Sequence, residues 1–349
     1  MDLVASVLDG NRLALARLLT QVENNTPGGR AALSELFSYT GGAHLVGVTG
    51  APGTGKSSLV NQLARYYRSL SEWRHSQQAP RVAIVAVDPS SPFTGGAILG
   101  DRVRMRDLAG DSGIFIRSMA SRGSLGGLAR STSGIVQALD AAGFDLIMIE
   151  TVGAGQAEID IARLAHTTLV IEAPGLGDDI QAIKAGILEI ADILVVNKAD
   201  RPGVESTERA LRGMLQLAHP APRVFQNHHL LETTFPLDGP AGDENKSIPE
   251  QPLWVSPIQR TVATEGGGIP ELAKIIEEHY HYLQDSGEWL RREHYRIKAE
   301  LDLLLQETLV ARWRSSVSEE RYSQVLQSLV ERELSPWDAV AKLTDGGVS

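Results

Sequence analysis

The stretch GAPGTGKS, residues 50–57, combines glycine, lysine and serine at a spacing suited to phosphate binding. It fits G-x-x-x-x-G-K-[ST], in which the glycines let successive backbone N–H groups face the phosphates. An apolar run precedes it and a helical pattern follows it, so a helix N-terminus would add its positive dipole end. We expect Lys56 to reach the β- and γ-phosphates and the Ser57 hydroxyl to ligate Mg²⁺. The predicted nucleotide loop comprises Gly50, Ala51, Pro52, Gly53, Thr54, Gly55, Lys56, Ser57 and Ser58.

A second motif, ETVG, occupies residues 150–153 and follows the apolar run FDLIMI. In P-loop enzymes an acid at the end of a neighbouring strand holds the Mg²⁺ shell. We interpret Glu150 as this acid, with a strand-capping carboxylate as the simpler alternative. Gly153 would offer its N–H to the γ-phosphate, so Lys56, Glu150 and Gly153 form the predicted catalytic group. Because Ala154 follows Gly153 where a catalytic glutamine would stand, we expect slow intrinsic hydrolysis.

The motif NKAD, residues 197–200, ends the last strong apolar run before residue 200. In an N-K-x-D motif the carboxylate, here Asp200, accepts hydrogen bonds from the N1–H and exocyclic amine of guanine. Asn197 would tie the loop and the stem of Lys198 would cover the base. Adenine has no such paired donor edge, and a site built for a hydrogen-bonding partner rejects the analogue that lacks it. The sequence therefore favours GTP and GDP over ATP, and we place a second base-contacting loop at VSPI, with Ser256 and Pro257.

Acidic and basic residues between these motifs extend the predicted metal site. Asp88 ends an apolar run and Asp101 follows a glycine-rich stretch, so both carboxylates could approach the edge where Mg²⁺ would bind. Asp101 also opens a helical pattern, and its simpler interpretation is an N-cap. The predicted metal ligands are thus Ser57, Asp88, Asp101 and Glu150. One of Arg102, Arg104 and Arg106 could neutralise charge in the transition state, although solvated surface is the usual role of such arginines.

The elements that must position these residues alternate from residue 44 to about 200. Apolar runs, continuous rather than alternating, are separated by helix-length spacers, which is typical of a parallel sheet covered on both faces. We predict an α/β fold of the P-loop NTPase type, with a mostly parallel central sheet. The predicted parts are an N-terminal helical cap at 1–40, a G domain at 41–284 with a polar insertion at about 226–252, and a helical dimerisation arm at 285–349. Within the cap, NNTPGGR is expected to break the helices.

Composition excludes several functions. The chain has 349 residues and a formal net charge of -10, which argues against nucleic-acid binding through a basic face. It has no cysteine, so disulfides and thiolate metal sites are excluded. No run approaches the roughly 18 apolar residues of a membrane helix, and Asp2 and Asp9 argue against a secretory signal. We expect a soluble cytoplasmic protein that binds neither membrane nor nucleic acid.

The order of six stretches resembles one family within the SIMIBI class of P-loop GTPases. They are GAPGTGKSS, VDPSSPFTGGAILGDRVRM, SRGSLGGLA, ETVGAGQAE, PGLGDDIQAIKAG and NKAD. Together they resemble the MeaB or ArgK-type G proteins that chaperone adenosylcobalamin-dependent acyl-CoA mutases, including methylmalonyl-CoA mutase. The resemblance covers most of the chain.

This resemblance implies more than the residues do alone. It implies a homodimer formed through the C-terminal arm, GTP hydrolysis that is stimulated by the mutase, and control of adenosylcobalamin loading. Asp178 and Lys184 match the segment that relays the nucleotide state, and Arg104 matches an arginine that approaches the nucleotide. The chain departs from the family at RSMAS, residues 117–121, where relatives have two prolines. We expect a less rigid loop there.

Three alternatives stay open at this point. A metal-insertion GTPase of the nickel-enzyme type would need histidine or cysteine clusters. His228 and His229 lie in a polar stretch, and His279 and His281 are two apart on a helix, so both pairs are interpreted as surface histidines. A P-loop kinase would more often bind ATP, against which NKAD argues. A nucleotide-binding assembly module without useful turnover is the third alternative.

Overall fold

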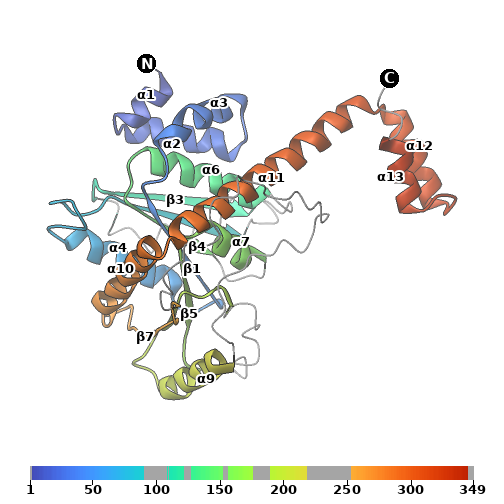
Figure 1. Ribbon diagram of the computed structural model, residues 1–349. Coiled ribbons are helices and arrows are strands. Elements are labelled where there is room, and N and C mark those ends of the chain that lie inside the picture. Colours follow the sequence, from blue (N-terminus) through green and yellow to red (C-terminus); the bar gives the residue numbers. More distant parts are fainter. Residues whose placement is uncertain are drawn as a thin grey trace, which may run out of the picture. The chain divides into compact units, whose positions relative to one another are not determined.

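The computed structural model describes residues 2–89, 108, 110–121, 127–151, 156–175, 189–217 and 253–344. The chain divides into two compact units, Met1–Tyr295 and Arg296–Ser349 (Figure 1). The predicted insertion at 226–252 lies outside the described residues.

A seven-stranded sheet forms the centre of the first unit, in the order β3-β2-β4-β1-β5-β6-β7. The strands are β1 His44–Gly50, β2 Val82–Pro89, β3 Ile114–Ser121, β4 Leu146–Thr151, β5 Thr167–Glu172, β6 Ile193–Val196 and β7 Ile258–Arg260. Every pairing between them is parallel. The central strands are buried on both faces, which explains why their sequences are continuous apolar runs. The predicted P-loop NTPase fold is confirmed.

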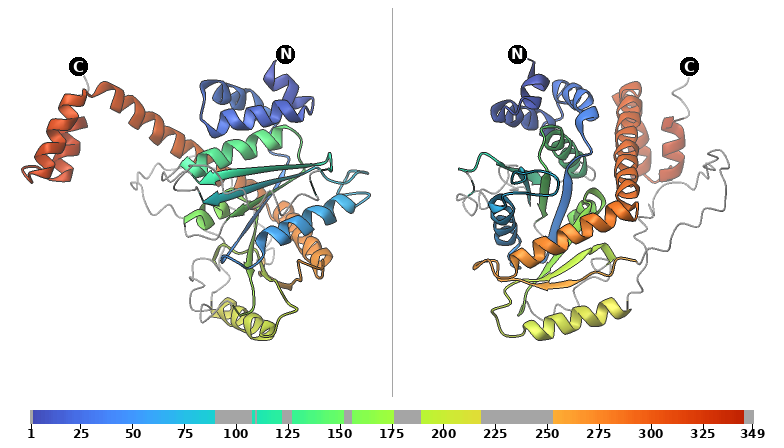
Figure 2. Two further views of the ribbon diagram at one scale, coloured as in Figure 1. Left: turned by 180° about the vertical axis from the view of Figure 1, so that it is seen from behind. Right: turned by 60° about the vertical axis from the view of Figure 1, so that its left-hand side comes forward.

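Helices cover both faces of the sheet. They are α1 Leu3–Leu8, α2 Arg12–Glu23, α3 Pro27–Leu36, α4 Lys56–Ser69, α6 Gly127–Ala141, α7 Gln156–Leu164, α9 Val204–Leu217 and α10 Ile269–Asp285, with a 3₁₀ turn η1 at Phe37–Tyr39. Helices α4 and α10 pack on one face, and α6, α7 and α9 on the other. The three N-terminal helices lie outside α6 and share its apolar core (Figure 2). They are therefore continuous with the packing of the first unit.

The stretch NNTPGGR does not act only as a breaker. It contains the start of α3, because Pro27 stands at the first helical position and the Thr26 side chain caps the helix. The Thr26 Oγ1 accepts a hydrogen bond from the Gly29 N–H at 3.1 Å. A capping threonine followed by proline is a strong helix start, and it outweighs the two glycines that follow.

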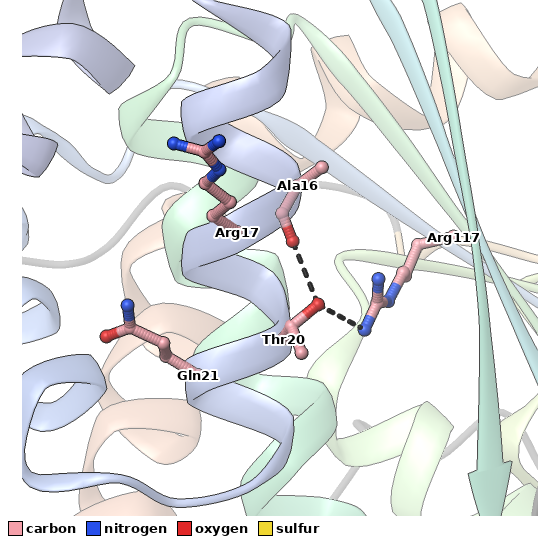
Figure 3. Close-up of a pocket in the computed structure, with 5 residues that line it drawn as sticks. All are labelled: Ala16, Arg17, Thr20, Gln21 and Arg117. Atoms are coloured by element: carbon pink, nitrogen blue, oxygen red, sulfur yellow. Dashed lines mark hydrogen bonds between the residues drawn. The ribbon is translucent and has the colours of Figure 1, made fainter.

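Two arginines join α2 to the edge strand β3. Arg12 donates to the carbonyl oxygens of Ser112 and Ile114, at 2.6 and 2.5 Å. At the other end of α2, Arg117 of β3 pairs with Glu23. It also donates to Thr20 Oγ1 at 3.4 Å (Figure 3). A surface hollow of about 450 Å³ lies beside this contact, lined by residues of α2 and by Arg117. The N-terminal helices thus cover part of an otherwise unpaired sheet edge.

The expected loop at residues 117–121 is wrong. These residues form the second half of β3 and pair with Val85–Pro89 of β2. Met119 is fully buried in this segment. Because proline has no N–H, a sequence without proline leaves the backbone here able to complete the ladder. The departure from the family pattern therefore accompanies a regular strand.

Helix α11, Glu288–Ser316, begins in the first unit and continues into the second. The second unit also contains α12 Glu319–Val330 and α13 Pro336–Thr344. Its buried core is small and consists of Val325, Ala339 and Leu343, packed by partly buried neighbours such as Trp313. The Trp313 indole N–H donates to the Leu343 carbonyl at 3.2 Å. Within the second unit, α12 and α13 thus form a helical hairpin that packs against the end of α11.

Candidate nucleotide site

The loop between β1 and α4 has the backbone conformation that its glycines permit. Gly50, Gly53 and Gly55 have φ of 139°, 82° and 95°, values that favour glycine. A Cβ on Gly50 would lie 2.1 Å from the Ile171 carbonyl oxygen. A Cβ on Gly55 would lie 2.5 Å from the Asn197 amide nitrogen. Gly50 and Gly55 are thus required by close approaches to Ile171 and Asn197, and Gly53 by its positive φ.

Lys56 opens α4 and is directed back into the loop. Its Nζ donates to the carbonyl oxygens of Gly50 and Ala51, at 2.8 and 3.0 Å. The side chain is buried, with 6% of its surface exposed. The ammonium group is thus buried at the start of α4, where a helix N-terminus favours an anion.

Ser57 and Glu150 meet beside this loop. The Ser57 Oγ donates to Glu150 Oε1 at 2.6 Å, and both side chains are buried. Glu150 reaches this position because β4 lies next to β1, with Val48 paired to Glu150. Its side chain shares the α4 face of the sheet with Met148, whereas Thr151 faces the other side and donates to Thr49 at 3.1 Å. The two oxygen-bearing groups predicted to hold a metal are therefore adjacent.

Asn197 connects three segments of the site. Its Nδ2 donates to the Thr54 carbonyl at 2.8 Å, which ties the phosphate loop. Its Oδ1 accepts hydrogen bonds from Thr261 Oγ1 and the Ala263 N–H, both at 3.1 Å. Lys198, with φ of 57°, donates to the Gly53 carbonyl at 2.5 Å. Asp200 is exposed at the surface beyond them.

Ser256 and Pro257 are not brought to this edge of the sheet. They precede β7 and lie at its amino end, where the Ser256 hydroxyl donates to the Ala191 carbonyl at 2.8 Å. The carboxyl end of β7 leads instead to Thr261–Ala263, which contacts Asn197. Sequence reasoning missed this segment because it placed the base-contacting loop at VSPI, which precedes most of β7 instead of following the strand. Pro257 was the available signal, since proline inside a sheet favours the beginning of a strand.

Of the remaining predicted site residues, the structure describes Asp88 and Ser58. Asp88 lies near the end of β2, which pairs with β4, so its backbone is on the same edge as the end of β4. Five others lie outside the described residues: Arg104, Asp101, Gly153, Asp178 and Lys184. Ser58 follows Ser57 in the first turn of α4 and is exposed.

His279 corrects an expectation about surface histidines. It is fully buried, while His281, two positions further along α10, is exposed. The buried face of α10 includes Ile276, His279 and Leu283, which are three and four residues apart. A polar residue type at an apolar helical position was the signal that the sequence offered.

Fold and site together define a P-loop nucleotide-binding protein whose base-reading motif is that of GTPases. The family described as methylmalonyl Co-A mutase-associated GTPase MeaB matches residues 15–318. The chain belongs to this family, and it is a GTPase.

Relatives agree with this assignment over nearly the whole chain. A putative GTPase of Pyrococcus horikoshii is 39% identical over 338 residues, which cover 97% of this chain and 95% of that protein. GTPase ArgK of Escherichia coli is 34% identical and covers 86% of this chain and 88% of its own. A crystal structure of a LAO/AO transport system kinase has a TM-score of 0.66 at 24% identity, covering 98% of this chain and 95% of that one. This last likeness supports the fold alone. Within the described residues, no helix is long and apolar enough to cross a membrane.

Proposed function

We propose that the protein is a Mg²⁺-dependent GTPase that acts as a chaperone of an adenosylcobalamin-dependent acyl-CoA mutase. Membership of the mutase-associated GTPase family carries this proposal. In this role GTP binding and hydrolysis would gate the loading of the cofactor and protect or reactivate the mutase. The client is methylmalonyl-CoA mutase or a related isomerase.

The contacts of Lys56, Ser57 and Glu150 support the nucleotide chemistry. Mg²⁺ prefers oxygen ligands and usually keeps one or two protein carboxylates or hydroxyls together with phosphate oxygens. The Ser57 hydroxyl and the Glu150 carboxylate, 2.6 Å apart, fit this preference. Ser57 and Glu150 would hold the Mg²⁺, which would supply positive charge to neutralise charge that develops on the phosphate. We assign Lys56 to the β- and γ-phosphates, and we propose Asp88 and Asp101 as further acids on the metal side.

The moving parts and the base contacts are proposed from the motifs. Gly153 would sense the γ-phosphate, and Arg104 would neutralise transition-state charge. Asp178 and Lys184 would relay the nucleotide state to the mutase. For the base, we propose Asp200 as the acceptor from guanine. Thr261–Ala263 replaces VSPI as the second base-contacting loop, since it contacts Asn197.

Measurement of phosphate release tests whether the protein hydrolyses GTP and whether the mutase stimulates it. We expect Mg²⁺-dependent GTP turnover that is slow alone, faster with the mutase and lost in Lys56→Ala. Turnover of ATP above that of GTP would overturn the guanine assignment. Asp200→Asn should shift the preference toward xanthine nucleotides, because the substitution exchanges an acceptor for a donor. If the mutase from the same cells does not change GTP turnover, the chaperone role is contradicted.

We propose that the second unit is a homodimerisation arm. Its small core leaves many large apolar side chains exposed, and burial of such a surface would favour association. They are Leu301, Leu305, Leu309, Val310, Leu326, Val330, Trp337 and Val340. Trp289, Arg292 and Glu293 pack within the first unit, so the informative truncation ends at Tyr295 rather than before residue 285. A shortened chain that still elutes as a dimer would exclude the arm as the interface.

A further inference from the structure

A cluster of buried polar side chains lies at the amino ends of β1, β5 and β6, opposite to the phosphate loop. His44 begins β1, Thr167 begins β5 after His166, and Asp192 directly precedes β6. His279 joins them from α10. All five are buried, with at most 4% of each exposed. Burial of so many polar groups is stable only when their hydrogen bonds are satisfied.

The contact with Arg74 fixes the proton position on His44. Arg74 Nη2 lies 2.9 Å from His44 Nδ1. A guanidinium group only donates, so this nitrogen of His44 accepts and its proton is on Nε2. That Nε2–H donates to Thr167 Oγ1 at 2.7 Å, and Thr167 Oγ1 lies 2.8 Å from His279 Nδ1. His279 Nε2 lies 3.5 Å from Asp192 Oδ1.

His166 is fixed in the same way. Its Nδ1 accepts a hydrogen bond from the Leu45 backbone N–H at 3.1 Å, and a backbone N–H can act only as a donor. Its Nε2–H therefore faces Glu293 Oε1, at 2.6 Å. The imidazole ring stacks on the Trp289 ring with centroids 3.8 Å apart. His44 and His166 are thus both neutral with the proton on Nε2.

The same cluster holds the first two turns of α11. Trp289 stacks on His166, and Glu293 receives its hydrogen bond. Arg292 donates to both carboxylate oxygens of Asp192, at 3.0 Å each, and also to the His166 carbonyl. These contacts join α11 to the sheet through the histidine cluster.

We propose that this cluster is an acid-sensitive lock, which holds the start of α11 against the amino end of the sheet while His44 is neutral. Protonation of His44 would place an N–H on Nδ1, directly against the Arg74 guanidinium. The lock would then open at the contact between β1, α10 and α11.

The charged groups around His44 make its protonation unfavourable in the closed form. Burial, together with the neighbouring positive groups, holds the pKa of His44 well below the usual 6.5. Arg74, His166, His279 and Arg292 face it and each opposes its protonation. The titratable Tyr280 of α10 also faces it, with ring centroids 5.2 Å apart. The nearby carboxylates are engaged elsewhere: Glu277 pairs with Arg74, Asp192 with Arg292, and Glu293 contacts His166.

The direction of the pH effect follows from this pKa. In the open form His44 would titrate near its usual pKa of about 6.5, whereas the closed form excludes the proton. The closed form is therefore fully stabilised above this pH and loses stability as the pH falls below it. Between pH 7.5 and 5.5, the equilibrium constant for opening should rise about tenfold for each histidine that is neutral in the closed form and free to titrate in the open form, and His44 is one of these.

Nitrogen NMR of the ¹⁵N-histidine-labelled full chain tests the closed state without any substitution. We expect His44 and His166 to be neutral at pH 7.5, both with the proton on Nε2. A charged His44, or a His44 proton on Nδ1, would overturn the proposal.

Hydrogen exchange tests the opening. After correction for the intrinsic pH dependence, exchange in residues 287–295 should rise at least tenfold from pH 7.5 to 5.5, while α4 changes less. His44→Gln, whose amide can still donate to Thr167, should reduce this rise about tenfold. His281→Gln on the exposed face of α10 is the matched control and should behave as the parent chain. Equal pH responses in 287–295 and α4 of the parent chain would refute the lock, even if His44→Gln failed to fold.

Discussion

The Asn197 contacts allow one substitution to be predicted in detail. Asn197→Ala removes three hydrogen bonds, to the Thr54 carbonyl, the Thr261 hydroxyl and the Ala263 N–H. Thr54, Thr261 and Ala263 are all buried, so water does not readily replace the lost partner. A typical net hydrogen bond contributes about 1 kcal/mol, and a buried group left unsatisfied costs about 1–3 kcal/mol. We expect the free energy of unfolding to fall by about 3–5 kcal/mol.

The same substitution should weaken nucleotide binding, since Asn197 orders the phosphate loop on one side and Thr261–Ala263 on the other. We expect affinity for a fluorescent GDP analogue to fall at least tenfold, which corresponds to about 1.4 kcal/mol. Denaturant unfolding and a fluorescence titration measure the two effects separately.

Asn11→Ala provides a matched control. Asn11 caps α2 by accepting hydrogen bonds from the N–H groups of Leu13 and Ala14, both at 3.0 Å. Loss of such a cap costs about 1 kcal/mol of stability but should leave GDP affinity unchanged. The reasoning fails if Asn197→Ala costs no more stability than Asn11→Ala and binds GDP as tightly as the parent chain.

Three further predictions concern the metal, the packing and the pH response. Glu150→Gln keeps the side-chain size but removes the charge 2.6 Å from Ser57, so the Mg²⁺ concentration for half-maximal GTP turnover should rise at least tenfold, about 1.4 kcal/mol. Gly47→Val should destabilise the fold by about 1–3 kcal/mol in thermal unfolding, because its Cβ would lie 2.6 Å from Ile161 Cγ2. The hydrogen bonds from Arg68 lower the pKa of Asp111 below 3.8, so Asp111 stabilises the fold above that pH and less as the pH falls through its folded pKa. Asp111→Asn should therefore lower stability at pH 7, and the difference from the parent should vanish in acid unfolding well below pH 3.8.

The phosphate loop was predictable because its chemistry is local. Gly50, Gly55 and Lys56 lie within seven residues, and the backbone that they require is encoded by those residue types. The sheet was predictable for a related reason, since strands buried on both faces must be continuous apolar runs.

The second base-contacting loop shows where such reasoning fails. Its position depends on which end of β7 meets Asn197, and that is set by strand pairing rather than by a local motif. An error of a few residues in the start of β7 moved the prediction from Thr261–Ala263 to Ser256 and Pro257 at the opposite end of the strand.

The histidine cluster could not be predicted by any local pattern. His44, Arg74, His166, Asp192 and His279 come from five segments that are far apart in the sequence. Apart from His279, which stands at an apolar position of its helix, each alone is consistent with a solvated surface residue. The parallel order of β1, β5 and β6 brings His44, His166 and Asp192 together, and α10 adds His279.

Strand β1 connects the buried histidine cluster to the phosphate loop. It begins at His44 in the buried cluster and ends at Gly50 in the phosphate loop, and seven residues at roughly 3.3 Å each separate the ends by about 20 Å. Between them, Gly47 packs so closely under Ile161 of α7 that a side chain would clash. Opening at the amino end can therefore release α11 while the hydrogen bonds from β1 to β4 and β5 hold the phosphate loop in place. If GDP affinity stays constant while residues 287–295 lose protection from hydrogen exchange, the two ends of β1 act independently. If GDP affinity and this protection fall together, β1 transmits the opening to the nucleotide site.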